Sequence, residues 1–257
     1  MLDIIDHSGI REICLARPPV NALDGELLRQ LVEAITSAHG SDALVISGQP
    51  GMFSAGLDVP GMLTLDRSGL AEVFLRLWHA QRAIATSPRP VIFGLTGHCP
   101  AGGTVLAIHG DYRVMAQNSA GAEFRMGLNE VQVGLFPGPV IHGAFRRLVG
   151  GHAAQLLTRG ALIDPGTALR VGLVDEVCDV THCAARALEV AREFCALPRE
   201  PMLRTRELAR RDLVELFGDA AGAEKNAQEF AEMGAQMWQD PATVARLQAL
   251  FKRKSAR

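Results

Sequence analysis

The pattern of apolar and polar positions divides the chain into two parts. Over the first 180 residues, short runs rich in β-branched residues predict strands at residues 10–15, 43–47, 91–95, 112–116, 131–133 and 173–177. Two stretches between them, residues 27–35 and 70–85, have the apolar spacing of amphipathic helices. Asp24 is placed to cap the first helix, and Pro88 and Pro90 end the second. Strands that alternate with helices predict an α/β fold with a parallel sheet.

The rest of the chain predicts helices alone. Apolar residues at helical spacing occur at residues 184–194, 208–217 and 244–251, without any strand pattern. We therefore divide the chain into a core at residues 1–180 and a helical C-terminal region at residues 181–257. Because these helices have few means of covering their apolar faces alone, we expect the region to dock on a neighbouring subunit.

Composition and charge exclude several classes of protein. An apolar content of 48% with 21% charged residues excludes intrinsic disorder. A net charge of -2, with 10 Phe, 2 Trp and 1 Tyr, provides neither the basic surface nor the stacking platforms that nucleic-acid binding needs. The apolar runs are much shorter than the roughly 20 residues of a membrane span. The first seven residues read as the start of a strand rather than a targeting signal, which favours a cytoplasmic protein.

The cysteines and histidines do not indicate a metal site. The five cysteines include no Cys-x-x-Cys pair, and the eight histidines show no zinc-binding spacing. We expect the cysteines to be reduced thiols that mostly pack in the core.

Three glycine-containing segments follow predicted strands, where α/β sheets place their ligands: residues 51–58, 97–104 and 127–134. A serine-hydrolase elbow around Ser54 would need glycine at Met52, and no dinucleotide or P-loop pattern is present. The predicted helix start at Gly102 offers free backbone N–H groups suited to an oxyanion. Taken singly, ordinary structural roles remain open for these glycines and for Glu130.

Five motifs in one order and spacing resemble the crotonase (enoyl-CoA hydratase/isomerase) superfamily, and within it particularly the Δ3,Δ2-enoyl-CoA isomerases of fatty-acid oxidation. The motifs are Arg17-Pro-Pro-Val-Asn-Ala-Leu, Phe53-Ser-Ala-Gly-Leu-Asp58, Cys99-Pro-Ala-Gly-Gly103, Asp111-Tyr-Arg and Gly127-Leu-Asn-Glu130. The resemblance runs from about residue 10 to about residue 180 and continues more weakly toward the C-terminus. Each motif alone is weakly specific, but five in register are a strong signal.

The resemblance implies both a fold and a site. The implied fold is a crotonase-like spiral of ββα units with a helical C-terminal trimerisation region, and hence a homotrimer or a dimer of trimers. The implied substrate is an acyl-CoA thioester, whose enolate oxygen accepts hydrogen bonds from the backbone N–H groups of Leu57 and Gly102. The residues expected on the CoA side are Ser54, Ala55, Gly56 and Asp58, with Asn129 beside the acyl group.

The resemblance also indicates a reaction. Hydratases of this superfamily carry two catalytic glutamates, one in the helix after the glycine pair and one in a later strand; here the first position is Val105 and the second is Glu130. Hydration needs a base and an acid, whereas a 1,3-proton shift needs one carboxylate. We therefore expect a Δ3,Δ2-enoyl-CoA isomerase of fatty-acid β-oxidation with Glu130 as its sole acid/base and without a metal or other cofactor, CoA being part of the substrate. If Val105, Leu128 and Phe136 surround Glu130, they exclude water and raise its pKa.

Two other readings stay open. One is an enoyl-CoA hydratase or another enolate-stabilising acyl-CoA enzyme, and the other is a non-catalytic acyl-CoA binding protein. The groups that meet the CoA phosphates are also undetermined, since few basic residues flank residues 53–58. Arg67 and the basic tail at residues 252–254 are the candidates.

Overall fold

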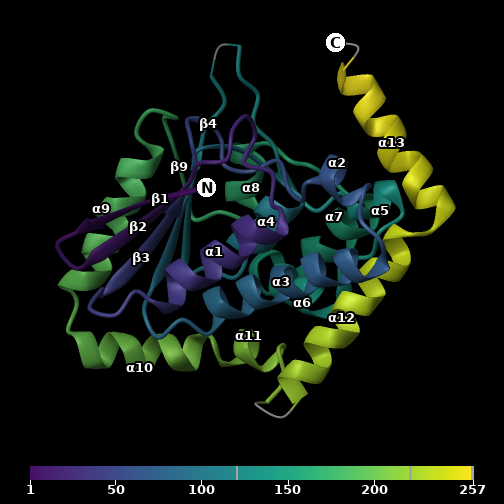
Figure 1. The fold of residues 1–257 in the computed structure, drawn as a ribbon. Helices are drawn as coiled ribbons and strands as arrows, with labels where there is room; N and C mark the ends of the chain where they lie inside the picture. The colour runs from purple at the N-terminus through teal and green to yellow at the C-terminus, as the bar shows by residue number, and fades with distance from the viewer. Residues whose placement is uncertain (120, 220–221, 256–257) are drawn as a thin grey trace.

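The computed structural model describes residues 1–119, 121–219 and 222–255, with side chains as far as residue 250. Two β-sheets, joined by helices, form its framework (Figure 1). The larger sheet has the strand order β1-β2-β3-β5-β7-β9, in which β1 and β2 are antiparallel and the other pairs are parallel. Its strands are β1 (Leu2–His7), β2 (Ile10–Leu15), β3 (Ala43–Ser47), β5 (Val91–Leu95), β7 (Tyr112–Ala116) and β9 (Glu176–Cys178). The smaller sheet is parallel and consists of β4 (Gly51–Met52), β6 (Gly97–Pro100) and β8 (Met126–Gly127).

The chain passes from the large sheet to the small sheet and then into a helix three times. The three turns are β3-β4-α3 (Arg67–Ala85), β5-β6-α4 (Gly102–Ala107) and β7-β8-α5 (Glu130–Val133), with the short helix α2 (Val59–Met62) inserted in the first. In each turn the loop after the small-sheet strand is carried to the same end of the molecule. This is the spiral of ββα units that the family resemblance implied.

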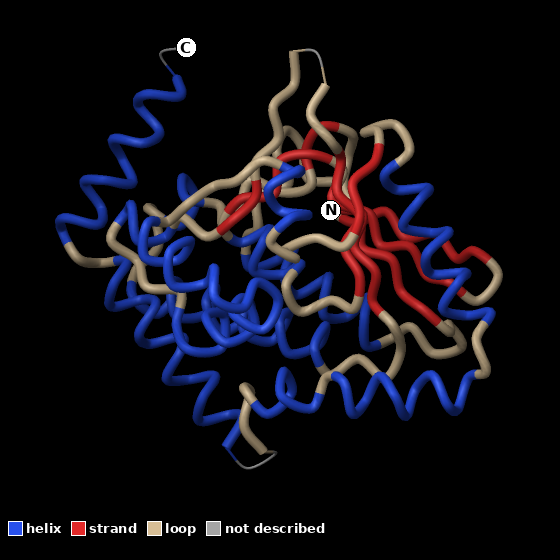
Figure 2. The backbone as a smooth tube through the Cα atoms, turned by 180° about the vertical axis from the view of Figure 1, so that it is seen from behind, coloured by secondary structure: helices blue, strands red, loops and turns tan. Residues whose placement is uncertain are grey.

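Helices cover both faces of the large sheet. Helix α9 (Cys183–Ala196) packs against β2, β3, β5 and β7 on one face, and a larger group of helices lies on the other side (Figure 2). The helices are α1 (Gly25–Thr36), α2 (Val59–Met62), α3 (Arg67–Ala85), α4 (Gly102–Ala107), α5 (Glu130–Val133), α6 (Gly138–Val149), α7 (Ala153–Arg159), α8 (Pro165–Arg170), α9 (Cys183–Ala196), α10 (Arg199–Ala209), α11 (Arg211–Glu215), α12 (Gly222–Trp238) and α13 (Pro241–Ser255), with a 3-10 turn at Gly150–His152. None of the described helices combines the length and apolarity needed to cross a membrane.

Local sequence explains the well-predicted elements. Strands β3 and β5 are buried at every residue, as expected for central parallel strands between two helical layers. The Asp24 side chain accepts a hydrogen bond from the Leu27 N–H at 2.7 Å and so caps α1, as predicted. Four predicted strands, β2, β3, β5 and β7, have the bounds read from the sequence.

Three predicted elements were wrong in type or extent. Residues 131–133, predicted as a strand, form a single helical turn that ends at Gly134, where φ is 92°. The strand predicted at residues 173–177 forms only over Glu176–Cys178. The helix predicted at 208–217 is divided at Arg210 between α10 and α11.

Candidate active site

A cavity of about 920 Å³ lies where the ends of the small-sheet strands meet the C-terminal helices. Its wall combines segments that are far apart in the sequence: residues 17–22, 52–60, 100–105 and 129–137, together with α3, α12 and α13. All three glycine-containing segments singled out in the sequence therefore contribute to one cavity.

The backbone N–H of Leu57 points away from its neighbouring chain segment. Leu23 and Leu57 form a parallel bridge, in which the Leu23 N–H donates to the Gly56 carbonyl at 2.8 Å and the Asp58 N–H donates to the Leu23 carbonyl at 3.0 Å. Consecutive backbone N–H groups of an extended strand face opposite sides. Because the Asp58 N–H faces Leu23, the Leu57 N–H faces away from Leu23. It has no acceptor within the described part of the chain, and Leu57 lines the cavity.

The second candidate amide belongs to Gly102, the first residue of α4. An N–H at this helical position has no partner inside the helix, and it finds none elsewhere among the described residues. A β-carbon built on Gly56 would lie 3.1 Å from the Gly102 nitrogen, and one built on Gly102 would lie 3.2 Å from the Leu57 nitrogen. Gly56 also has a φ of 89°, which favours glycine. The two free amides are therefore neighbours, and side chains at these glycines would separate them.

Glu130, which is the first residue of α5, also lies in the cavity wall. The residue is half-buried, but its Oε2 atom is shielded from solvent and has no hydrogen-bond partner within the described chain. This burial raises the pKa of the Glu130 carboxyl to about 7. Val105 and Phe136 line the cavity with it, whereas Leu128 is buried outside the wall.

Asp58 is the other carboxylate among the described wall residues, but it is already paired. Its Oδ2 atom accepts a hydrogen bond from the Arg17 Nη2 at 2.6 Å, and its Oδ1 atom accepts from the Gly61 N–H at 3.2 Å. Both oxygen atoms of the Asp58 carboxylate therefore have partners, whereas Glu130 Oε2 has none in the described part of the chain. Glu130 is therefore the carboxylate of this wall that is free to exchange a proton.

The remaining predicted site residues fall into two groups. Ala55 and Asn129 line the cavity, as Asp58 does. Ser54 and Gly56 lie beneath the wall: the fully buried Ser54 hydroxyl donates to the Asn21 carbonyl at 2.7 Å and accepts from the Gly56 N–H at 3.2 Å. Ser54 thus holds the loop that carries Leu57 rather than facing the cavity.

Sequence reasoning assigned no role to Asn21 or Arg17, although both belong to a quoted motif. Asn21 is buried at a φ of 48°; its side chain donates to the Phe53 carbonyl at 3.0 Å and accepts from the Arg17 N–H at 2.9 Å. Arg17 lines the cavity beside Asp58. A polar residue that follows two prolines was the available signal, because such a position frequently forms a turn with side-chain hydrogen bonds.

The apolar end of the cavity is closed by helices of the same chain. Helix α12 packs along α3, and both contribute to the wall together with α13. The apolar side chains at this end are Phe74, Leu77, Phe230, Met233, Met237, Trp238, Leu247 and Leu250. The expectation that the C-terminal helices depend on a neighbouring subunit for cover therefore does not hold for α12.

The candidate phosphate-binding residues lie elsewhere or beyond description. Arg67 is not in the cavity wall, and its Nη2 pairs with the Glu232 carboxylate at 3.0 Å. The side chains of the basic tail at residues 252–254 lie outside the described residues. Among the described residues, no group of three or more His, Cys, Asp or Glu side chains is arranged to hold a metal ion.

A family model, related sequences and a solved structure all match this chain. The family model described as enoyl-CoA hydratase/isomerase matches residues 6–236. The human mitochondrial enoyl-CoA delta isomerase 1 is 29% identical over 216 residues, which cover 79% of this chain and 68% of that protein. A probable enoyl-CoA hydratase, EchA17 of Mycobacterium avium, is 30% identical over 76% of each chain. The crystal structure of human mitochondrial Δ3-Δ2-enoyl-CoA isomerase shares the fold, with a TM-score of 0.87 at 24% identity over 99% of this chain and 98% of that one.

Proposed function

Because the chain belongs to the enoyl-CoA hydratase/isomerase family, we propose that it is a Δ3,Δ2-enoyl-CoA isomerase of fatty-acid β-oxidation. Its reaction moves the double bond of a cis or trans 3-enoyl-CoA into conjugation, giving trans-2-enoyl-CoA. The observation that carries the proposal is the Glu130 carboxylate, whose Oε2 atom has no hydrogen-bond partner among the described residues and which shares one cavity wall with Val105 and with the Leu57 and Gly102 amides. The names of the relatives include isomerases and hydratases, so the choice rests on this chemistry.

The proposed reaction is a proton transfer that one carboxylate completes. Glu130 removes a proton from C2 while the thioester oxygen accepts hydrogen bonds from the Leu57 and Gly102 N–H groups. The C2–H electrons form the new C2–C3 double bond. The electrons of the old C3–C4 double bond then form the new C4–H bond with the proton that Glu130 returns. Each well-aimed oxyanion donor contributes about 2.7–4 kcal/mol in related acyl chemistry. Neither a metal nor a redox cofactor enters this balance.

Val105 distinguishes this reaction from hydration. Addition of water across the double bond requires a second group that activates water or protonates carbon, and an aliphatic side chain does neither. Asp58, paired with Arg17, is unsuited to replace it. The apolar surroundings of Glu130 also lower the local supply of water, which favours return of the proton to the substrate.

A spectrophotometric assay tests the proposal. Conversion of 3-hexenoyl-CoA into a conjugated thioester raises ultraviolet absorbance, and we expect the wild-type protein to catalyse it. Glu130→Gln keeps the size of the side chain but removes its basicity, so kcat should fall by at least about 100-fold. Glu123→Gln is the matched control, because Glu123 is an exposed glutamate outside the cavity wall and should leave kcat unchanged.

Each other outcome supports a different function. An active Glu130→Gln variant contradicts the proposal. Rapid loss of the conjugated absorbance of crotonyl-CoA identifies a hydratase, the activity named for the Mycobacterium avium relative. Tight binding of CoA esters without turnover of any enoyl-CoA identifies a non-catalytic binding protein.

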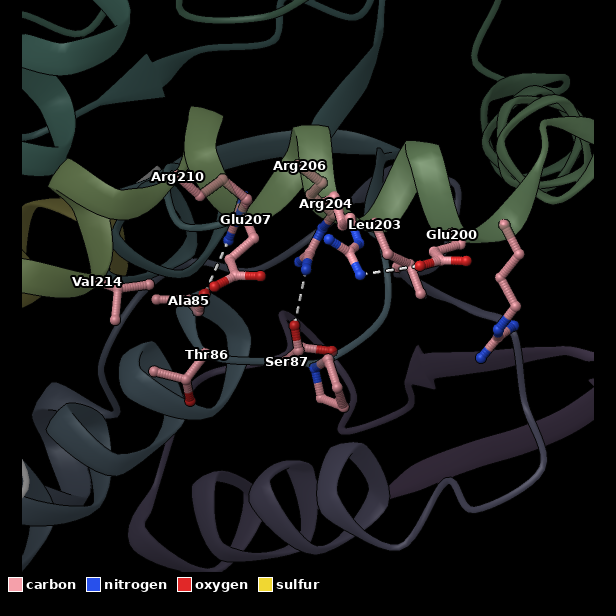
Figure 3. A pocket seen from close by; sticks show the side chains of 12 residues that line it. Ala85, Thr86, Ser87, Glu200, Leu203, Arg204, Arg206, Glu207, Arg210 and Val214 are labelled. Atoms are coloured by element: carbon pink, nitrogen blue, oxygen red, sulfur yellow. Dashed lines mark hydrogen bonds and ion pairs between the residues drawn. The ribbon is translucent and has the colours of Figure 1, made fainter.

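The proposed assembly is a homotrimer or a dimer of trimers, and α10 supports it. No residue of α10 is buried within the chain. Polar contacts tie the helix to the core, among them those of Arg206, whose guanidinium bonds Asp111 at 2.8 and 2.9 Å and the Ser87 carbonyl at 2.9 Å. Figure 3 shows Arg206 of α10 reaching toward Ser87, and Arg210, which follows α10, reaching toward Ala85. These residues line a hollow of about 690 Å³. An isolated helix of 11 residues is marginally stable in water, so α10 is suited to packing against another copy of the chain.

A further inference from the structure

Arg17 occupies an unusual position at the edge of the candidate active site. It follows strand β2, lines the cavity, and its side chain is 27% exposed. Its Nη1 atom donates to the Ala22 carbonyl at 2.9 Å, and its Nη2 atom lies 2.6 Å from Asp58 Oδ2 and 3.1 Å from Asp24 Oδ2. One guanidinium thus joins three groups from two separate segments of the chain.

These three groups flank the bridge between Leu23 and Leu57. Ala22 and Asp24 are the residues on either side of Leu23, and Asp58 directly follows Leu57. The backbone bridge itself has two hydrogen bonds, from Leu23 to Gly56 and from Asp58 to Leu23. Arg17 therefore ties together the two segments that form this bridge, through the side chains of Asp24 and Asp58 and through the Ala22 carbonyl.

Both carboxylates are also fixed on their far sides. Asp24 Oδ1 accepts the Leu27 N–H at 2.7 Å and caps α1, while Asp58 Oδ1 accepts the Gly61 N–H at 3.2 Å and caps α2. Each carboxylate is held between a helix N-terminus and the same guanidinium, so its freedom to rotate is small. Through Asp58, this rigidity is passed to the neighbouring backbone amide of Leu57.

We propose that Arg17 is a positioning residue of the oxyanion hole, which acts through Asp58 and the Leu23–Leu57 bridge to aim the Leu57 N–H into the cavity. The inference rests on the proposed function, in which this N–H receives the thioester oxygen. Such a role fits the physical demands of the site, because a misplacement of about 1 Å in an active site can cost about 100-fold in rate.

Direct binding of a CoA phosphate is the competing role for Arg17. Two carboxylates lie within 3.1 Å of its Nη2 atom, so the local charge around the guanidinium is already more than compensated. An incoming phosphate would meet two negative charges as well as one positive charge, which disfavours its binding there. The bonding pattern therefore favours the positioning role.

The test separates positioning from substrate binding and from stability. Arg17→Met removes all three bonds and keeps an unbranched side chain, and Asp58→Asn weakens the ion pair while keeping a cap acceptor. Arg29→Met is the control, because Arg29 pairs with Glu26 and Glu33 on the exposed face of α1 and does not line the cavity. We expect Arg17→Met to lower kcat for 3-hexenoyl-CoA by about 10- to 100-fold with less than a threefold change in KM, and Arg29→Met to change neither.

A bound chromophore reports on the hole without any turnover. A cinnamoyl-CoA with a para-dimethylamino group absorbs at longer wavelength when its carbonyl oxygen accepts strong hydrogen bonds. The wild-type protein should produce this red shift, Arg17→Met should lose most of it, and Arg17→Lys should restore part of it. Because the two residues act in sequence, Arg17→Met should cost much less in the Asp58→Asn background than in the wild type.

The possible results are distinguishable. A raised KM with unchanged kcat, an unchanged red shift in Arg17→Met, or additive effects of the two substitutions overturns the positioning role. If Arg17→Met does not fold, the same readouts in Arg17→Lys and Asp58→Asn decide the question. A red shift that depends on Arg17 in a protein that isomerises no enoyl-CoA retains the positioning role and rejects the proposed function.

Discussion

At the scale of the residue, the placement of Glu130 determines when the site can act. Its Oε2 atom is buried without a partner in the described part of the chain, and this burial raises the pKa of the carboxyl to about 7, from an ordinary value near 4.5. In the proposed reaction, the group must be ionised to remove a proton from C2. A raised pKa therefore makes Glu130 a stronger base, but it also leaves the carboxyl protonated and inactive in acid.

The pH dependence of catalysis follows with a definite sign. We expect kcat/KM to rise with pH, about tenfold per unit below pH 7, and to level off above it, because kcat/KM reports the ionisation of the free enzyme. The measurement is the isomerisation rate of 3-hexenoyl-CoA between pH 5 and pH 9. A 3-hexenoyl-pantetheine thioester serves as control, since it has no phosphate that titrates near about pH 6. A profile that is flat above pH 5.5 with both substrates contradicts the assignment.

Residue identities alone located the site better than they explained it. The glycine-containing segments could be recognised because they follow strands, but the roles of Leu57 and Gly102 came from the family resemblance. Nothing in the residue type of Leu57 shows that its amide is free; that depends on the bridge to Leu23, more than 30 positions earlier. The family resemblance also placed Ser54 on the CoA side of the site. Its hydrogen bond to the Asn21 carbonyl, which holds it beneath the cavity wall, could not be read from the sequence.

At the scale of the element, the contact between α3 and α12 shapes the apolar end of the cavity. A β-carbon built on Gly234 of α12 would lie 2.5–2.7 Å from ring atoms of Phe74 on α3. The Phe74 ring has little room to withdraw, because it makes edge contacts with Phe230 and Trp238 at centroid distances of 6.1 and 6.0 Å. The small residue at 234 therefore sets how closely α12 approaches α3.

We expect Gly234→Ala to push α12 away from α3. The strain should lower the free energy of unfolding by about 1–3 kcal/mol, although alanine is the better helix former. The displaced wall should also change the preference among 3-enoyl-CoA substrates of increasing chain length. Thermal unfolding and a chain-length series of kcat/KM measure the two effects. Gly222→Ala, at the first position of the same helix, is the control, and equal behaviour of the two variants rejects the role of Gly234.

Sequence patterns identified elements where packing agrees with local preference. Helix α12 was not predicted: its buried face is built largely from small residues, Ala223, Ala227, Ala231, Gly234 and Ala235, and glycine is a poor helix former. The Val-Gln-Val alternation of α5 suggested a strand, but a run of three residues carries little information. Its left-handed glycine at position 134 closes a helical turn instead, and this turn presents Glu130.

At the scale of the whole molecule, the spiral of ββα units brings distant motifs together, while α10 remains on the outside. Each turn of the spiral delivers one segment to the cavity, so the order of the motifs in the sequence becomes their arrangement in space. The alternation of strands and helices predicted an α/β fold with a parallel sheet, and the family resemblance predicted the spiral. A surface suited to joining copies of the chain was not predictable in the same way, since exposure of an apolar side chain depends on which neighbouring helices cover it.

The exposed face of α10 leads to a prediction about assembly. Leu208 is 63% exposed and Leu197, just before the helix, is 51% exposed; a second hollow, of about 540 Å³, adjoins Leu197. If α10 joins copies of the chain, the wild-type protein has a mass in solution of three or six times 27.6 kDa, and Leu208→Lys, which places a charge in the interface, shifts it toward the monomer. Light scattering after size-exclusion chromatography measures both masses.

Ile5→Lys is the control, because Ile5 is 50% exposed on strand β1, and it should leave the mass unchanged. A monomeric wild type, or an oligomer that Leu208→Lys leaves intact, rejects α10 as the interface.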